Sequence, residues 1–173
     1  MNKIPKRYIP SILSKTLRER RGYRYAVNRL KQDTIRQRRA ILRSRKAYQK
    51  GKYVDRPHIA SFVNKKSPHV YRATNLYGVP SMVPTPTLAR ATGCRQSALK
   101  QIIKKGEGAF YSSGSRPNQT AQSWAYARLG SALTGGPSSQ VDYKILEKGC
   151  SRKSRPLQLA NQTRRLESKN NIR

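Results

Sequence analysis

Acidic residues are scarce in this sequence: 7 Asp or Glu stand against 38 Lys or Arg in 173 residues, which gives a formal net charge of +31. The carboxylates are scattered, and Asp142 and Glu147, five positions apart, form the closest pair. Paired carboxylates for general acid–base catalysis are therefore not expected. The excess of positive charge indicates a polyanionic partner or a place inside a large assembly.

Histidine and cysteine are also rare, with two of each. His58 and His69 fall in a proline-rich stretch, so a Ser or Cys nucleophile elsewhere in the sequence lacks a neighbouring base. Cys94 and Cys150 form neither a CxxC pair nor a zinc-ligand spacing. We expect two reduced cysteines packed as small hydrophobic residues. We also expect a protein that is not an enzyme, with no catalytic residue, metal, cofactor or small-molecule substrate.

Leu, Ile, Val and Phe together make up 32 of the 173 residues. A highly charged chain in which these residues make up less than one-fifth is expected to be disordered in isolation. A self-sufficient, evenly packed globule is therefore excluded. The first ten residues, with Pro5 and Pro10, lack a continuous apolar stretch, and no later run approaches membrane-spanning length. We expect a protein made and used in the cytosol or nucleus.

The positive charge is concentrated at the two ends. Residues 1–56 carry +16, residues 57–150 carry +9 and residues 151–173 carry +6. Residues 11–50 contain no proline and a single glycine, Gly22. This composition predicts a short helix, a break and a longer helix, which together form a basic helical arm over 1–56.

The longer helix has a narrow apolar stripe at intervals of three, four or seven residues, formed by Val27, Leu30, Thr34, Ile41 and Tyr48. Such a helix can pack one face against a neighbouring protein, while its remaining surface binds phosphate or acidic side chains. Acidic partners at i+4 are almost absent, which argues against a merely solvated charged face. The candidate anion contacts on this helix are Arg38, Arg39, Arg43 and Arg45.

Residues 57–86 contain five prolines, Pro57, Pro68, Pro80, Pro84 and Pro86. Each removes a backbone donor and restricts the preceding residue, so a long helix is excluded. The segments HIASFV and HVYRA are consistent with short extended pieces. We predict a Pro-rich extended connector of the kind that crosses other subunits.

Residues 87–150 are predicted to form a compact helical domain. Four short helices are expected, beginning near Thr87, Ser97, Thr120 and Asp142 and ending at Gly93, Gly106, Gly135 and Gly149, with Thr87 and Asp142 as N-caps. The expected core is Leu99, Ile102, Ile103, Phe110, Trp124, Leu129, Leu133, Ile145 and Leu146. So small a core barely offsets the entropy of ordering the chain, which makes its stability depend on outside contacts.

Residues 151–173 are basic and polar, and we expect a tail that is disordered until bound. The predicted fold class is mainly α: a small four-helix domain with a long basic N-terminal helical arm, a Pro-rich extended strap and a basic C-terminal tail.

One loop combines hydroxyls, a glycine and a guanidinium just before a helix start. A possible anion contact is formed there by Ser112, Ser113, Ser115 and Arg116. The alternative, which we favour, is a tight turn shaped by Gly114 and Pro117, in which the hydroxyls and Asn118 satisfy backbone groups and cap the helix. The loop is neither a Walker motif nor a dinucleotide fingerprint.

Tyrosine is the dominant aromatic residue, with ten copies against two Phe and one Trp. Five of them are interleaved among arginines: Tyr8, Tyr23, Tyr25, Tyr48 and Tyr53. This pattern is typical of base stacking in RNA-binding segments. It is equally typical of wet protein interfaces, and the sequence leaves both open.

Residues 91–150 read ATGCRQSALKQIIKKGEGAFYSSGSRPNQTAQSWAYARLGSALTGGPSSQVDYKILEKGC. With the order SSGSRPNQT…SW…ARL…TGG…D…IL, the stretch from Gly78 to Cys150 resembles an uncharacterised domain of virion proteins from nucleocytoplasmic large DNA viruses. The resemblance implies a virion or capsid-associated protein and carries over no active site. Residues 1–56 and the tail lie outside it.

The expected function is that of a minor capsid protein on the inner face of an icosahedral double-stranded DNA virus shell, where it bridges and stabilises capsomers. Its expected partners are the major capsid protein, other minor capsid proteins, and viral DNA or an anionic membrane surface. The alternative is a genome-condensing or RNA-binding protein that contacts backbone phosphates. A ribosomal-type protein with basic extensions fits the composition but not the resemblance.

Overall fold

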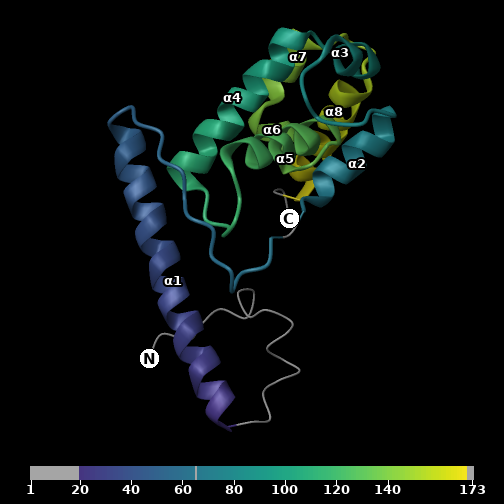
Figure 1. Ribbon diagram of the computed structural model, residues 1–173. Coiled ribbons are helices and arrows are strands. Elements are labelled where there is room, and N and C mark those ends of the chain that lie inside the picture. The colour runs from purple at the N-terminus through teal and green to yellow at the C-terminus, as the bar shows by residue number, and fades with distance from the viewer. Residues whose placement is uncertain (1–19, 65, 171–173) are drawn as a thin grey trace. The chain divides into compact units, whose positions relative to one another are not determined.

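The structure, a computed structural model, describes residues 20–64 and 66–170, with side chains over 26–64 and 66–169. The described residues form the helices α1 (Arg20–Gln49), α2 (Pro68–Tyr77), α3 (Pro86–Thr92), α4 (Gln96–Ser113), α5 (Ala121–Leu133), α6 (Pro137–Val141), α7 (Tyr143–Gly149) and α8 (Arg155–Asn170) (Figure 1). Within this part of the chain there is no strand, and the predicted mainly α fold class is confirmed. Tyr8, most of the short helix expected before Gly22, and the side chains of Tyr23 and Tyr25 lie outside the described residues.

The described residues divide into two compact units. Unit 1 comprises residues 20–64 and 111–120, and unit 2 comprises residues 66–110 and 121–170. These units differ from the predicted domains, because the predicted connector is split between them and the loop 111–120 joins the basic helix rather than the helical domain. The predicted tail belongs to unit 2.

In unit 1, α1 is a single helix that continues through Gly22, so the break expected there is wrong (Figure 1). Its buried side is the stripe Leu30, Gln37, Ala40 and Ser44, whose intervals of seven, three and four residues are those of one helix face. Of the predicted apolar stripe, Leu30 is buried and the other positions are half-buried. Leu30 joins Ile59 and Phe62 in a core cluster of three residues.

In unit 2, α2 occupies part of the segment expected to be extended, so the extended conformation predicted for HVYRA is wrong. The side chain of the N-cap Ser67 accepts from the backbone N–H of His69, and Pro68 occupies the first turn, where its missing N–H costs nothing. The helix then packs on α5: a Cβ at Gly130 would lie 2.6 Å from the His69 carbonyl oxygen. Glycine at 130 therefore permits this close crossing.

Helix α3 begins two residues earlier than predicted, because the N-cap is Thr85 rather than Thr87, and it ends at Gly93 with φ +66°. Helix α4 continues through Gly106, which was expected to end it. A Cβ at Gly106 would lie 2.6 Å from the Cα of Ala125 in α5. Glycine is therefore required there by helix packing and not by a stop.

The predicted core residues gather in unit 2. Leu99, Ile102, Leu129, Leu133 and Leu146 are fully buried in one cluster, against which Ile103 and Ile145 pack. Phe110 is also buried, and its ring lies 6.3 Å from that of the half-buried Trp124. The cluster extends beyond the prediction to Ala73, Met82 and Leu88 among others.

The C-terminal segment is not a disordered tail, which corrects that prediction. Over Arg155–Asn170 it forms α8, which contacts α5, α6 and α7. Leu157 is 6% exposed and Ala160 is fully buried. The apolar positions are too sparse for a strong sequence signal, yet they suffice because small residues allow close packing.

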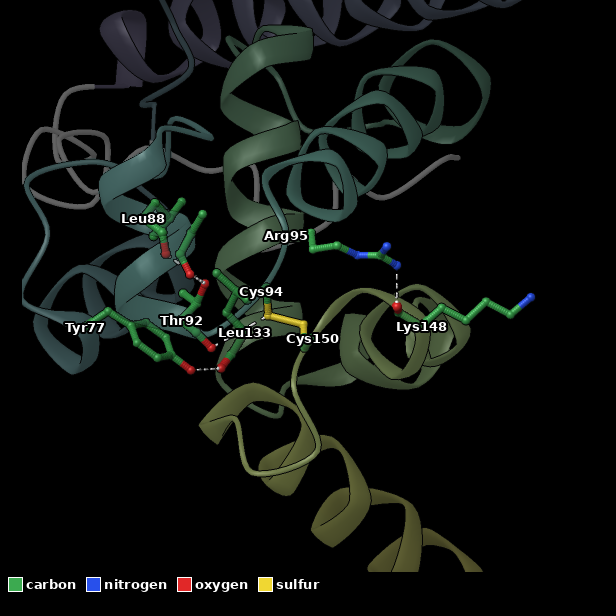
Figure 2. Close-up of a disulfide and its surroundings, with 9 residues drawn as sticks. Tyr77, Leu88, Thr92, Cys94, Arg95, Leu133, Lys148 and Cys150 are labelled. Atoms are coloured by element: carbon green, nitrogen blue, oxygen red, sulfur yellow. Dashed lines mark hydrogen bonds between the residues drawn. A yellow bond between two sulfur atoms is a disulfide. The ribbon is translucent and has the colours of Figure 1, made fainter.

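The two cysteines form a disulfide, Cys94–Cys150, so the expected reduced state is wrong (Figure 2). They face each other across a single antiparallel bridge. The flanking hydrogen bonds run from Arg95 N–H to the Gly149 carbonyl at 2.7 Å and from Ser151 N–H to the Gly93 carbonyl at 2.9 Å. A separation of 56 residues hides this pairing from the sequence, whereas their burial as small side chains follows the prediction.

Asp142 precedes α7 as predicted, but its side chain makes no capping hydrogen bond. The fully buried carboxylate instead accepts two hydrogen bonds from Arg128, at 2.7 and 2.9 Å, and an ion pair from Lys105 at 2.7 Å. A buried charge is tolerated when it is paired and hydrogen-bonded in this way. The prediction that Asp142 caps α7 is therefore wrong, and its side chain is instead the centre of a buried ion-pair network.

Candidate functional site

The exposed surface of α1 carries positive charge arranged with a period of seven residues. The first row is Arg29, Arg36 and Arg43 and continues to Lys50 just after the helix, and the second row is Lys31, Arg38 and the half-buried Arg45. Residues seven apart in an α-helix lie about 10.5 Å apart along the axis and only about 20° apart around it. These cations therefore form two longitudinal rows, which we call the first and second cation rows, and the exposed Arg39 and Lys46 belong to neither row.

Two large apolar side chains lie between these rows. Ile35 is 52% exposed and Leu42 is 55% exposed, and they too are seven residues apart. The acidic residue within α1, Asp33, is half-buried and accepts a hydrogen bond from Ser61 at 2.6 Å. No carboxylate on α1 thus neutralises the exposed cations in the described part of the helix.

The C-terminal end of α1 is closed by Gly51, which has φ +71°. The N–H of Gly51 donates to the Tyr48 carbonyl and the N–H of Lys52 donates to the Ala47 carbonyl, both at 2.9 Å. This pair of bonds is a Schellman motif, which requires the left-handed conformation that glycine adopts without strain. The chain reverses and carries Tyr53 back to Tyr48.

Three tyrosine rings meet at this end of α1. The rings of Tyr48 and Tyr111 stack at 5.8 Å, and Tyr53 meets Tyr111 edge-on at 5.2 Å and Tyr48 at 5.8 Å. Tyr111 is 8% exposed, whereas Tyr53 is 69% exposed. The hydroxyl of Tyr111 donates to Asp55 Oδ1 at 3.4 Å. We call Tyr48, Tyr53 and Tyr111 the tyrosine cluster.

Two guanidinium groups accompany the cluster. Arg45 donates to the Ser113 carbonyl at 3.1 Å and Arg56 donates to the Gly114 carbonyl at 2.8 Å. Burial, and secondarily the neighbouring charge of Arg45, lowers the pKa of Arg56. The second cation row therefore ends beside the tyrosine cluster in a concentration of positive charge.

These contacts also involve the loop for which the sequence left two interpretations, a possible anion contact and the favoured tight turn. Ser112, Ser113, Ser115 and Arg116 are exposed, as are Arg38, Arg39 and Arg43 on α1. Arg45 is brought to the loop, but it binds a backbone carbonyl, so the arginine braces the loop from within unit 1. Of the candidate arginines on α1, Arg45 is the one whose hydrogen bond to this loop the structure shows, a contact that the sequence did not predict.

Asn118 performs the role expected of it in the alternative interpretation. Its side-chain amide donates to the carbonyls of Ile59 at 2.9 Å and Phe62 at 2.6 Å, and its Oδ1 accepts from the Ile59 N–H at 2.9 Å. Its φ of +53° is a conformation that asparagine tolerates. The loop and the 59–62 turn are consequently held together.

Sequence reasoning missed Arg56 and Tyr111 as members of this site. Tyr111 lies 58 positions after Tyr53 in the sequence, so no local pattern links them. A usable signal was the density of tyrosine and basic residues between Arg43 and Arg56, which contains both Tyr48 and Tyr53. The local sequence gives no reason to separate these residues from the rest of the basic arm.

Unit 2 presents a second basic surface around the disulfide. A shallow hollow there is lined by Arg90, Arg95 and Lys148 together with both cysteines, and Figure 2 shows Arg95 reaching the Lys148 carbonyl, at 2.5 Å. Over residues 20–64 and 66–170, no group of three His, Cys, Asp or Glu could hold a metal ion. Nor does the described part of the chain contain a helix long and apolar enough to cross a membrane.

These features define a mainly helical protein that combines a disulfide-linked helical unit with a strongly basic helix. The chain belongs to the family described as "Family of unknown function (DUF5824)", which matches residues 22–141. The matched region begins within α1, so the basic helix is part of the family's domain, although the resemblance noted over 78–150 left it outside. Neither the curated proteins nor the solved structures give a match to this chain.

Proposed function

We propose that this chain is a structural, non-catalytic minor capsid protein on the inner face of a large icosahedral double-stranded DNA virus shell, where it bridges and stabilises capsomers. The observation that carries the proposal is the one-sided charge of α1: its exposed ionisable side chains, from Arg29 to Lys46, are all basic. Such a helix repels copies of itself and requires an anionic neighbour.

Unit 2 supplies the second half of the proposal. Its core, its disulfide and the Asp142 ion pairs make it suited to dock on the major capsid protein or on other minor capsid proteins. The resemblance of residues 78–150 to a virion domain points the same way. In this arrangement α1 faces viral DNA or an anionic membrane surface.

Purified virions test the proposal directly. Shells stripped of DNA and membrane should retain the protein, because its attachment is to capsomers. If the protein leaves with the genome or with the lipid, the bridging role is wrong. Major capsid protein recovered in the same shells serves as the control for shell integrity.

A second candidate function, a genome-condensing or RNA-binding protein that contacts phosphates, is favoured by the two cation rows. Each phosphate neutralised on duplex DNA contributes about −0.9 to the slope of log K against log salt concentration. The variant Arg38→Gln/Arg39→Gln should make the slope shallower by about 2. Lys100→Gln/Lys104→Gln, which changes two exposed cations of α4, is the matched control and should leave the slope unchanged.

A further inference from the structure

The tyrosine cluster differs from the rest of the basic surface, because phosphate binding alone has no use for an exposed aromatic ring. Tyr53 is 69% exposed, yet its ring is fixed by contacts with Tyr48 and Tyr111 at 5.8 and 5.2 Å. A ring that is both exposed and held in place loses little conformational entropy when it is covered by a flat partner. This combination is the physical requirement for a stacking platform.

The charge around the ring defines the kind of partner. Lys50 and Lys52, both exposed, lie on either side of Gly51 in the turn that leads to Tyr53. Arg45 and Arg56 lie beside Tyr111 and bring two like charges close together. Asp55, whose Oδ1 accepts from Tyr111, supplies one negative charge at the cluster. The balance with Arg45, Lys50, Lys52 and Arg56 remains positive, so it favours a partner that offers a flat π-face and negative charge together.

We propose that Tyr53 stacks a base of single-stranded nucleic acid while the flanking basic residues hold its phosphates. This inference extends the phosphate-binding candidate above and rests on it. A duplex keeps its base faces stacked inside, whereas a single strand exposes them.

The second cation row leads to the tyrosine cluster. Its members stand about 10.5 Å apart along α1, and the row ends at Arg45 beside the cluster. Phosphates on one strand of a duplex rise by about 3.4 Å each along the axis. The row can therefore contact about every third phosphate of a strand, and the requirement for an unstacked base at Tyr53 is what selects a single strand over a duplex.

An acidic protein segment is the competing partner, since tyrosine is also common at protein interfaces. Carboxylates satisfy the cations but supply no π-face for Tyr53. Nucleic acid supplies both chemical features in one molecule, and for this reason we prefer it.

The experiment compares two labelled 20-unit probes that carry the same phosphates: a dT oligonucleotide and an abasic oligomer of equal length. The full-length wild-type chain should bind the dT probe about tenfold more tightly than the abasic probe, as measured by fluorescence anisotropy at low salt. Tyr53→Ala should abolish this preference and leave binding of the abasic probe unchanged. Tyr53→Phe, which keeps the ring, should retain the preference.

The matched control is Tyr71→Ala, which removes a tyrosine that is also 69% exposed but belongs to unit 2; it should keep the preference. Equal binding of both wild-type probes overturns the stacking site and leaves phosphate binding intact. Tighter binding of a 20-base-pair duplex, or equally tight binding of a 20-residue oligoglutamate, also overturns it. Absence of binding to every probe at low salt removes the phosphate-binding candidate and the stacking site together.

Discussion

Unit 2 buries the charge of Asp142 between two cations and links distant segments by a disulfide, whereas unit 1 buries Gln37 and Ser44 against a core cluster of three residues. The Gln37 Oε1 and Ser44 Oγ atoms have no hydrogen-bond partner among the described residues. Each buried polar atom left in this state costs about 1–3 kcal/mol. Unit 2 also contains such an atom, Ser154 Oγ, but it has the buried Asp142 ion pairs as well, which have no counterpart among the described residues of unit 1.

This difference fits the division of function that we propose. A unit that is stable alone can be a fixed point of attachment. A basic helix with a small core and unsatisfied polar groups gains stability when a partner binds, because binding to the folded state shifts the equilibrium. The comparison teaches that the charge excess and the weak packing belong to the same part of the chain.

The largest effect should come from removing the buried carboxylate in unit 2. Asp142→Ala leaves Arg128, whose side chain is 16% exposed, without its partner. Breaking a buried ion pair from one side costs about 3–5 kcal/mol. The fluorescence of Trp124, the single tryptophan and a member of unit 2, should report unfolding at much lower urea concentration. Glu147→Ala removes an exposed carboxylate from α7 and should change little; an equal loss in both variants would contradict the role of Asp142.

The disulfide should give the next largest effect. Cys94→Ala/Cys150→Ala opens a link between residues 56 apart, and loss of such a link costs about 2–4 kcal/mol. The Trp124 signal should shift accordingly, while hydrogen exchange of α1 in unit 1 should stay as in wild type. Reductant should destabilise the wild type and leave the double variant unaffected. A reductant effect on the variant would mean that the disulfide is not the source of stability.

Local signals in the sequence predicted the helix ends where a glycine adopts the left-handed conformation that ends the helix. Gly93 ends α3 as expected, and the end of α5 at Leu133 lies just before Gly135. The predicted helix ends are wrong where the residue instead makes a contact with a residue distant in the sequence. Gly106 matches the local pattern of a helix stop, but its role is the close contact with Ala125 in another helix, which no local pattern shows.

The same limit applied to the candidate site. Arg45 was selected from the sequence, but its partner, the Ser113 carbonyl, lies 68 residues away. Likewise the carboxylate of Asp142 pairs with Arg128 and Lys105, which lie on other helices, and does not cap α7. Composition located the basic region, and only the fold could show which of its residues meet.

A smaller effect is expected at Tyr77, whose hydroxyl donates to the Leu133 carbonyl at 2.6 Å (Figure 2). Tyr77→Phe should cost about 1 kcal/mol near neutral pH. Burial raises the pKa of Tyr77, so above pH about 10 the unfolded chain releases this proton while the folded chain keeps it. Its contribution is therefore complete below that pH and is lost as the pH rises. Urea unfolding followed by Trp124 should show the gap between variant and wild type narrowing from pH 9 to 11; a constant gap would contradict the raised pKa.

The finest test applies one substitution to a buried serine in each unit. Ser131, 3% exposed in unit 2, accepts a hydrogen bond from the Ser138 N–H at 3.2 Å, whereas Ser44, fully buried in unit 1, has no hydrogen-bond partner among the described residues. Ser131→Ala should destabilise unit 2 by about 1 kcal/mol. Ser44→Ala should stabilise α1 by about 0.5 kcal/mol, because it removes an unsatisfied hydroxyl and alanine favours the helix. The measurements are urea unfolding followed by Trp124 for the first variant and hydrogen exchange of the α1 amides for the second. If both substitutions destabilise their units equally, the hydroxyl of Ser44 is satisfied after all, and the contrast between the two units does not extend to their buried polar groups.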